Sequence, residues 1–308
     1  MKKILTGIIA ITAAAAMNCA SAQEVAALPN GVTASVGEST TPTTTVLGGD
    51  VVEYKDYTPE LSLSLLSVSA TIGYESEYVF RGEKYAGHSI QPGLEFAYPI
   101  YGIDIYAGGW YTSPVQGSKK DELTELDIYA GATYTYGAVT FDVGYIYYWY
   151  PEVTSESESV SRDMEVYCGV TVDTSSYLGI NLNPSAYYFY NWVLKQQVVE
   201  ISIGYEAPIG EWVIDNDKLT MPLNLYGGYL SAGRKYGDID GIDNAGVSYF
   251  YYGASADIAY ALTDYCTISG GIRYSQRDGG NEGEPVDHAE LYGRERNLWF
   301  GAKVSFGF

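Results

Sequence analysis

From Leu66 to the C-terminus, apolar and polar residues of this chain alternate with a period of two. Successive side chains of a β-strand point to opposite faces, so this alternation is typical of strands with one apolar and one polar face. The first apolar register comprises Leu66, Val68, Ala70, Ile72, Tyr74, Tyr78 and Phe80, and the opposite face carries Ser67, Ser69, Thr71, Glu75, Glu77 and Arg81. The sequence contains about twelve such segments, many of them near the ~10 residues of a tilted membrane strand. It therefore predicts an all-β protein.

The aromatic residues distinguish a membrane barrel from a soluble sandwich. Tyrosine alone accounts for 32 of the 308 residues. The apolar registers are mostly aliphatic in the middle and aromatic at the ends, as at Tyr145, Tyr147 and Trp149. Aromatic rings at both water interfaces give this distribution, whereas a sandwich would place them in its core. We predict a transmembrane antiparallel β-barrel of about 12 strands, within about two.

The N-terminus has the features of a secretory signal. Lys2 and Lys3 precede an apolar stretch that ends near Met17, and the small residues of Ala20-Ser21-Ala22 form a cleavage site. We therefore expect residues 1–22 to be a cleaved signal peptide and the mature chain to lie in the outer membrane. Residues 23–65, which show no sustained period, are expected to form an irregular periplasmic segment or a partial plug. Residues 66–308 form the expected barrel.

Connection lengths and the last residues of the chain agree with a barrel. Short connections such as Gly137-Ala138 alternate with long polar ones, as expected of periplasmic turns and external loops. Two connections depart from this pattern. The connection from Ala207 to Lys218 is long although it lies on the turn side, and the one from Val193 to Gln196 is short although it lies on the loop side. The alternating apolar residues from Phe300 to Phe308 resemble the terminal signal that is recognised for barrel insertion, and they also suit a last strand that closes the sheet.

Two segments carry a family resemblance. Ser76-Glu77-Tyr78-Val79-Phe80-Arg81-Gly82, followed by Gln91-Pro92-Gly93, resembles a motif of the TorF-type porins, also called the Gcw_chp domain family. Glu77 stands where that motif usually has Asp. The segments 125–131 and 142–151 resemble the next strands of the family. This resemblance covers about residues 66–170 and implies an outer-membrane channel, with no indication of its cargo.

The charged residues on the polar face suggest what the channel would conduct. The chain has a formal net charge of -21, which excludes an extended basic surface for nucleic acid. Carboxylates lining a low-dielectric channel concentrate cations, so we expect a cation-preferring pore for small polar or cationic solutes. In an alternative interpretation, some carboxylates simply pair with arginines across the lumen. The candidate pore-lining residues are Glu75, Glu77, Arg81, Glu95, Asp104, Asp127, Asp142, Glu165, Glu200, Asp257 and Arg273.

Arg81 and the inward-facing aromatic residues each have two interpretations. Arg81 would act in a constriction, where its planar guanidinium orients a carboxylate or phosphate, or would form a structural pair with Glu77 or Glu83 near the rim. The aromatic residues would form a stacking path for sugars or nucleosides, or would fill a narrow barrel. They are Tyr106, Trp110, Tyr129, Tyr148, Tyr187 and Tyr226.

Other function classes have weaker signals. The chain has only two histidines, so we expect no histidine-rich metal site, no cofactor and no enzyme activity. The pair Asp287-His288 leaves a hydrolase of the outer membrane as a remote alternative. A second alternative is a surface adhesion or structural protein, in which the barrel anchors long loops such as 151–162 and 277–293. The outer-membrane lipid is an expected partner, and we expect Cys168 and Cys266 to face it.

Overall fold

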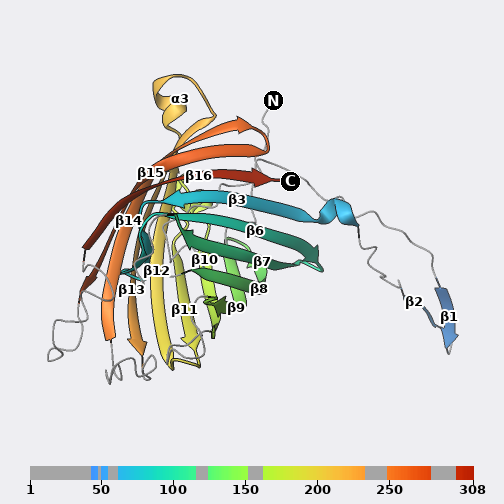
Figure 1. Ribbon diagram of the computed structural model, residues 1–308. Helices are drawn as coiled ribbons and strands as arrows, with labels where there is room; N and C mark the ends of the chain where they lie inside the picture. Colours follow the sequence, from blue (N-terminus) through green and yellow to red (C-terminus); the bar gives the residue numbers. More distant parts are fainter. Residues whose placement is uncertain are drawn as a thin grey trace.

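The computed structural model describes residues 43–47, 50–54, 62–115, 124–151, 162–232, 248–278 and 296–308. The signal peptide expected at residues 1–22 lies outside these residues, as does most of the segment expected at 23–65. In the described chain, twelve strands form a closed barrel (Figure 1). None of the described helices is long and apolar enough to cross a membrane.

The barrel strands follow one another around the wall with antiparallel pairing throughout. They are β3 (Ser67–Glu75), β6 (Ser89–Ile100), β7 (Ile103–Pro114), β8 (Glu125–Tyr136), β9 (Val139–Trp149), β10 (Arg162–Val172), β11 (Ser185–Asn191), β12 (Gln196–Ala207), β13 (Leu219–Ala232), β14 (Ser248–Thr263), β15 (Cys266–Asp278) and β16 (Arg296–Gly307). The last strand, β16, pairs with the first, β3, with Val304 opposite Ile72. This pairing closes the sheet, so the prediction of a barrel of about twelve strands is confirmed.

The remaining described elements are not strands of the barrel wall. Strands β1 (Thr43–Leu47) and β2 (Asp50–Tyr54) pair only with each other, and so do β4 (Tyr78–Phe80) and β5 (Glu83–Ala86). In the described part of the chain, three short helices connect strands or precede them: η1 (Leu63–Leu65), α2 (Ser175–Leu178) and α3 (Ile209–Val213). The β4–β5 pair lies in the connection between β3 and β6.

The two ends of the barrel have different connections. Tyr101 and Gly102 link β6 to β7 with φ angles of 52° and 81°, the left-handed conformation of a tight hairpin turn. We call this end of the barrel the turn end and the opposite end the loop end. The helix α3 occupies the long connection that the sequence predicted at the turn end, and Trp192 to Lys195 form the short connection predicted at the loop end. The antiparallel order places the C-terminus at the turn end with α3.

The outer face of the barrel is apolar, with aromatic residues at both ends. Its middle exposes aliphatic side chains, namely Ile128, Val143, Ile201, Leu225, Ile258 and Ile272. Toward the loop end it exposes Trp149, Trp192 and Phe250, and toward the turn end Tyr136 and Phe308. Cys168 is exposed on the same outer face, where it pairs with Val143 and Tyr188. This surface matches a hydrocarbon layer between two interfaces.

The buried side chains that pack against one another lie inside the barrel. The buried cluster takes its residues from inward-facing strand positions, which are Tyr106, Tyr129, Ile146, Tyr148, Tyr167, Tyr187, Phe189, Val198, Leu230, Tyr249 and Tyr251. The expectation that Tyr78 and Phe80 continue the lipid-facing register of the first strand is wrong. The strand β3 ends at Glu75, and the chain then turns inward, so that Tyr78 is 1% exposed.

We predict that an arginine in the middle of the outer face destabilises the barrel. Ile201→Arg, at the centre of β12, should lower the free energy of unfolding by about 2–4 kcal/mol, because the charge must enter the hydrocarbon layer. Leu262→Arg, close to the turn end of β14, is the control and should cost about 0–1 kcal/mol. Urea unfolding in lipid vesicles measures both values. Equal losses for the two variants would contradict a lipid-facing belt.

Candidate functional site

The predicted pore-lining residues of the barrel strands all face inward, and the structure places most of them in contact with other side chains. Glu75, Arg81, Asp127, Asp142, Glu165, Glu200, Asp257 and Arg273 are buried. Glu77, Glu95 and Asp104 are half-buried. Arg81 and Glu77 belong to the β3–β6 connection rather than to the wall. The lumen at the buried positions is therefore filled with protein.

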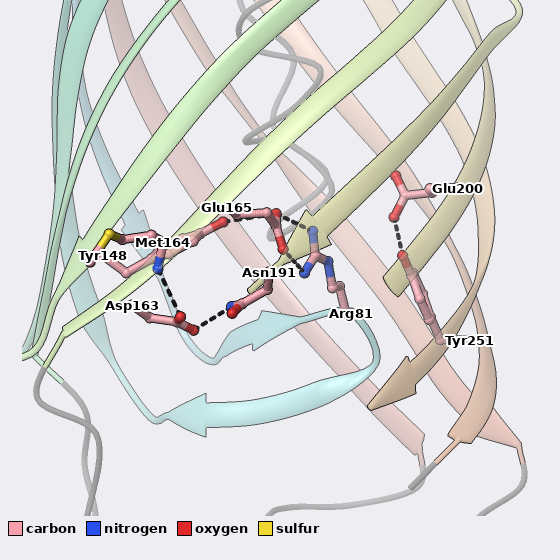
Figure 2. Close-up of polar contacts among 8 residues, drawn as sticks. All are labelled: Arg81, Tyr148, Asp163, Met164, Glu165, Asn191, Glu200 and Tyr251. Atoms are coloured by element: carbon pink, nitrogen blue, oxygen red, sulfur yellow. Dashed lines mark hydrogen bonds and ion pairs between the residues drawn. The ribbon is translucent and has the colours of Figure 1, made fainter. Parts of the chain in front are cut away.

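One of these buried contacts joins Arg81 to Glu165 on β10. The guanidinium donates two parallel hydrogen bonds, from Nη1 to Oε2 at 3.0 Å and from Nη2 to Oε1 at 2.7 Å (Figure 2). The hydroxyl of Tyr148 donates to the same carboxylate at 3.2 Å, and the guanidinium lies 4.8 Å from the centre of the Phe189 ring. Paired arginine–carboxylate bonds of this kind are strong and fix the orientation of both groups.

Asp163 and Asn191 extend this network along the wall. The Asn191 side-chain amide donates to Asp163 Oδ2 at 2.6 Å (Figure 2). Its oxygen accepts from the backbone N–H of Leu194 at 2.9 Å. Asp163 Oδ1 accepts from the backbone N–H of Met164 at 2.7 Å. Each of these polar groups is thereby satisfied, as burial requires.

The conformation of Arg81 is unusual for a residue with a side chain. Its φ angle is 48°, and Gly82, which follows it, has a φ angle of 86°. Both residues form the turn between β4 and β5, where left-handed backbone is needed. The expectation that Arg81 pairs with Glu77 or Glu83 is wrong, because Glu77 pairs with Lys84 and Glu83 pairs with Arg277. The turn aims Arg81 across the lumen instead.

A second buried cation lies on β15. Arg273 is placed between two carboxylates, with Nε 3.2 Å from Glu75 Oε1 and Nη1 2.9 Å from Asp257 Oδ1. All three side chains are buried. The alternative interpretation, in which lumen carboxylates pair with arginines, is thus confirmed for these residues and for Glu165.

Other carboxylates accept hydrogen bonds from tyrosine hydroxyls. Asp142 accepts from Tyr106 at 2.7 Å and from Tyr187 at 3.1 Å. In the same way Glu95 accepts from Tyr129 at 3.0 Å, and Glu200 accepts from Tyr251 at 2.5 Å. Most of the inward-facing tyrosines therefore fill the barrel and satisfy its carboxylates, which is the second of the two roles considered for them.

The tyrosine rings fit into the wall because glycines lie beside them. A methyl group added at Gly228 would stand 2.4 Å from Cζ of Tyr251, and one added at Gly169 would stand 2.3 Å from the ring of Tyr187. The same close approach occurs between Gly144 and Tyr167 and between Gly131 and Tyr106. Each of these glycines occupies an inward-facing register position, but no role was predicted for them from sequence.

Three polar residues of the filled lumen, Tyr78, Glu125 and Asn191, were not among the sites predicted from sequence. The Tyr78 hydroxyl donates to Glu125 Oε2 at 2.8 Å, and Asn191 holds Asp163 as described above. Glu125 begins β8 in the same inward register as Asp127, and this register would have identified it. The alternation could not identify Tyr78 as an inward-facing residue, because the strand β3 ends at Glu75, before Tyr78. Among the described residues no group of three or more His, Cys, Asp or Glu side chains is arranged to hold a metal ion.

About half of the chain is similar in sequence to a family whose function is undetermined. Residues 62–214 match the model of a family described as "Bacterial protein of unknown function (Gcw_chp)". This match confirms the Gcw_chp part of the resemblance, and the TorF porin name stays a prediction. No curated protein sequence matches the chain significantly.

Several solved structures are similar to the chain. A NanC porin shares 12% identity at a TM-score of 0.43, covering 78% of this chain and 98% of its own. A KdgM porin shares 8% identity at a TM-score of 0.40, and the match covers 79% of this chain and 99% of the porin. LpxR from Salmonella typhimurium shares 9% identity at a TM-score of 0.41, and the match covers 78% of this chain and 99% of LpxR.

The location of the protein follows from its own surface. A closed antiparallel barrel leaves no open sheet edge, and this barrel carries an apolar belt between aromatic ends. Barrels with these features span outer membranes. The structure therefore places this chain in the outer membrane, in contact with its lipid.

We predict that filling the space beside one tyrosine destabilises the lumen. Gly228→Ala should lower the free energy of unfolding by about 1–3 kcal/mol, because the buried Tyr251 ring has no room to move away. The adjacent Gly227 faces lipid, and the nearest atom to an added methyl group is 3.6 Å away. Gly227→Ala is therefore the matched control and should not be destabilising. A smaller loss at Gly228 than at Gly227, measured by urea unfolding in vesicles, would refute the packing role.

Proposed function

We propose that the protein forms an outer-membrane channel for small polar solutes, with a preference for cations. The observation that carries this proposal is a closed barrel whose inner face is polar and charged while its outer face is apolar. A barrel that served only as an anchor would need no such concentration of charge inside. The porin resemblance of the sequence supports the same function.

The expected cation preference rests on the charges along the inner face. Carboxylates occupy many inward-facing positions of the described strands, whereas the cations there are Arg273, Arg277 and Lys303. Several carboxylates are neutralised by the ion pairs described above. Glu95 and Asp104 have no cationic partner among the described ion pairs and are half-buried, so they are the residues best placed to attract a cation.

We predict that neutralising these two carboxylates weakens cation preference. In a salt gradient across a planar bilayer, the parent protein should show a cation-selective reversal potential. Glu95→Gln combined with Asp104→Asn should lower the cation-to-anion permeability ratio by about two- to fivefold, because the charges that concentrate cations are gone. Glu211→Gln, on the exposed helix α3, should leave the ratio unchanged. Anion preference of the parent would contradict the proposed selectivity.

The anchor alternative is supported by one observation, the burial of so many inward-facing side chains. In that case the barrel would hold loops 151–162 and 277–293 at the cell surface, and these loops lie largely outside the described residues. Absence of ion conductance from a protein that keeps a heat-modifiable folded form on gels would favour the anchor or a plugged barrel. Conductance favours the channel.

We also propose that the barrel has no enzyme activity. The only pair that suggested hydrolysis, Asp287-His288, lies outside the described residues. Peptide cleavage by the parent protein that disappears in His288→Ala would overturn this proposal.

A further inference from the structure

The connection between β3 and β6 enters the barrel rather than remaining outside it. Glu75 ends β3 directly opposite Ser89, which begins β6, so a two-residue turn would suffice to join them. The chain instead inserts residues 76–88, including β4 and β5. We call the segment Tyr78–Ala86 the inner hairpin. Its residues Tyr78, Val79, Arg81 and Ala86 are 1–4% exposed, although they belong to a connection at the loop end.

The inner hairpin contacts one side of the wall through Tyr78 and Arg81. Tyr78 donates to Glu125 on β8, and Arg81 binds Glu165 on β10. The Arg81 guanidinium also lies over Phe189 on β11. In Figure 2 Arg81 extends from the turn of the hairpin toward Glu165 on the surrounding wall.

The same hairpin contacts the other side of the wall through Gly82 and Glu83. The Asn297 amide on β16 donates to the carbonyl oxygen of Gly82 at 3.4 Å, and Glu83 forms an ion pair with Arg277 on β15. A methyl group at Gly82 would stand 2.9 Å from Cβ of Tyr251 on β14, so the turn lies directly against the wall. In the closed order of twelve strands, β10 and β16 are diametrically opposite. The inner hairpin therefore spans the full width of the lumen.

We propose that the inner hairpin is a plug that closes the channel toward the loop end and is held in place mainly by the Arg81–Glu165 pair. This inference rests on the proposed channel function and adds how that channel is regulated. The pair is suited to hold a movable segment because neither group is stable in a buried site without the other. Loss of either partner favours a position of the hairpin in which the remaining charge reaches water.

The two partners differ in what their removal leaves behind. A carboxylate left alone can neutralise itself by taking up a proton, whereas a guanidinium keeps its charge. Glu165→Gln, which leaves Arg81 buried and charged, should therefore open the channel more than Arg81→Gln. Reversing the pair, with Arg81→Glu and Glu165→Arg together, should restore closure at least in part. Mere loss of local structure would not produce this order or this rescue.

Single-channel recording in planar bilayers tests the proposal. We expect the parent to be mostly closed, Glu165→Gln to raise the fraction of open time by about tenfold or more, and the reversed pair to lower it again. Lys84→Gln is the matched control, because the Lys84–Glu77 pair joins two residues of the same connection at 2.7 Å and does not reach the wall. It should leave the open fraction near that of the parent.

A deletion separates failure of the plug from failure of the channel. Residues 76–88 are replaced by Asn-Gly, which suits the two-residue turn between Glu75 and Ser89. Folding of every variant is checked by its heat-modifiable mobility on gels. Continuous conductance of the folded deletion variant supports the plug. Equal, high conductance of parent and deletion variant overturns the plug and keeps the channel, and absence of conductance from both overturns the channel itself.

If the deletion variant does not fold, Arg81→Lys provides the decisive comparison. Lysine keeps the charge but cannot form both parallel bonds to Glu165. An open fraction between those of the parent and Glu165→Gln supports the plug. An open fraction equal to that of the parent in both Arg81→Lys and Glu165→Gln overturns it.

Discussion

The absence of water in the hydrocarbon layer is the constraint on which this structure depends. Every backbone N–H and C=O in that layer needs a partner within the protein, so a sheet that spans it must close on itself. The pairing of β16 with β3 provides that closure, and it unites residues more than two hundred positions apart. Closure creates an inner space, and the way this space is filled decides what the protein does.

The inside of this barrel resembles the core of a soluble protein made largely of tyrosine, carboxylate and arginine. Tyrosine rings lie beside glycines of neighbouring strands, which allows large side chains into a narrow barrel, and their hydroxyls satisfy carboxylates such as Asp142 and Glu200. Buried charges require partners, and Arg81 and Arg273 supply them. The inner hairpin brings Arg81 into this core from a connection. That hairpin is held to the wall by side-chain contacts and not by the hydrogen-bond ladder between strands.

The wall of the barrel could be predicted well from sequence, and its contents could not. Alternation located strands such as β9 and β14 because each side chain of the wall has only two directions available. The same rule placed Glu75, Asp142 and Glu165 on the inner face. It failed at Tyr78 and Phe80, because alternation presumes that a strand continues, and nothing in the local pattern indicates that β3 ends at Glu75. The partner of Arg81 was also missed, since Glu165 lies 84 residues away along the chain.

The sequence by itself determined the class of fold, the approximate number of strands, the membrane that surrounds them and the side of the wall on which the charges of the strands lie. These properties depend on the two-residue period and on the partition of residues between lipid and water, both of which are local. Only the tertiary structure decided that the lumen is filled and that residues 78–86 cross it. That outcome depends on which strands face one another across the barrel, a relation that appears only when the sheet closes.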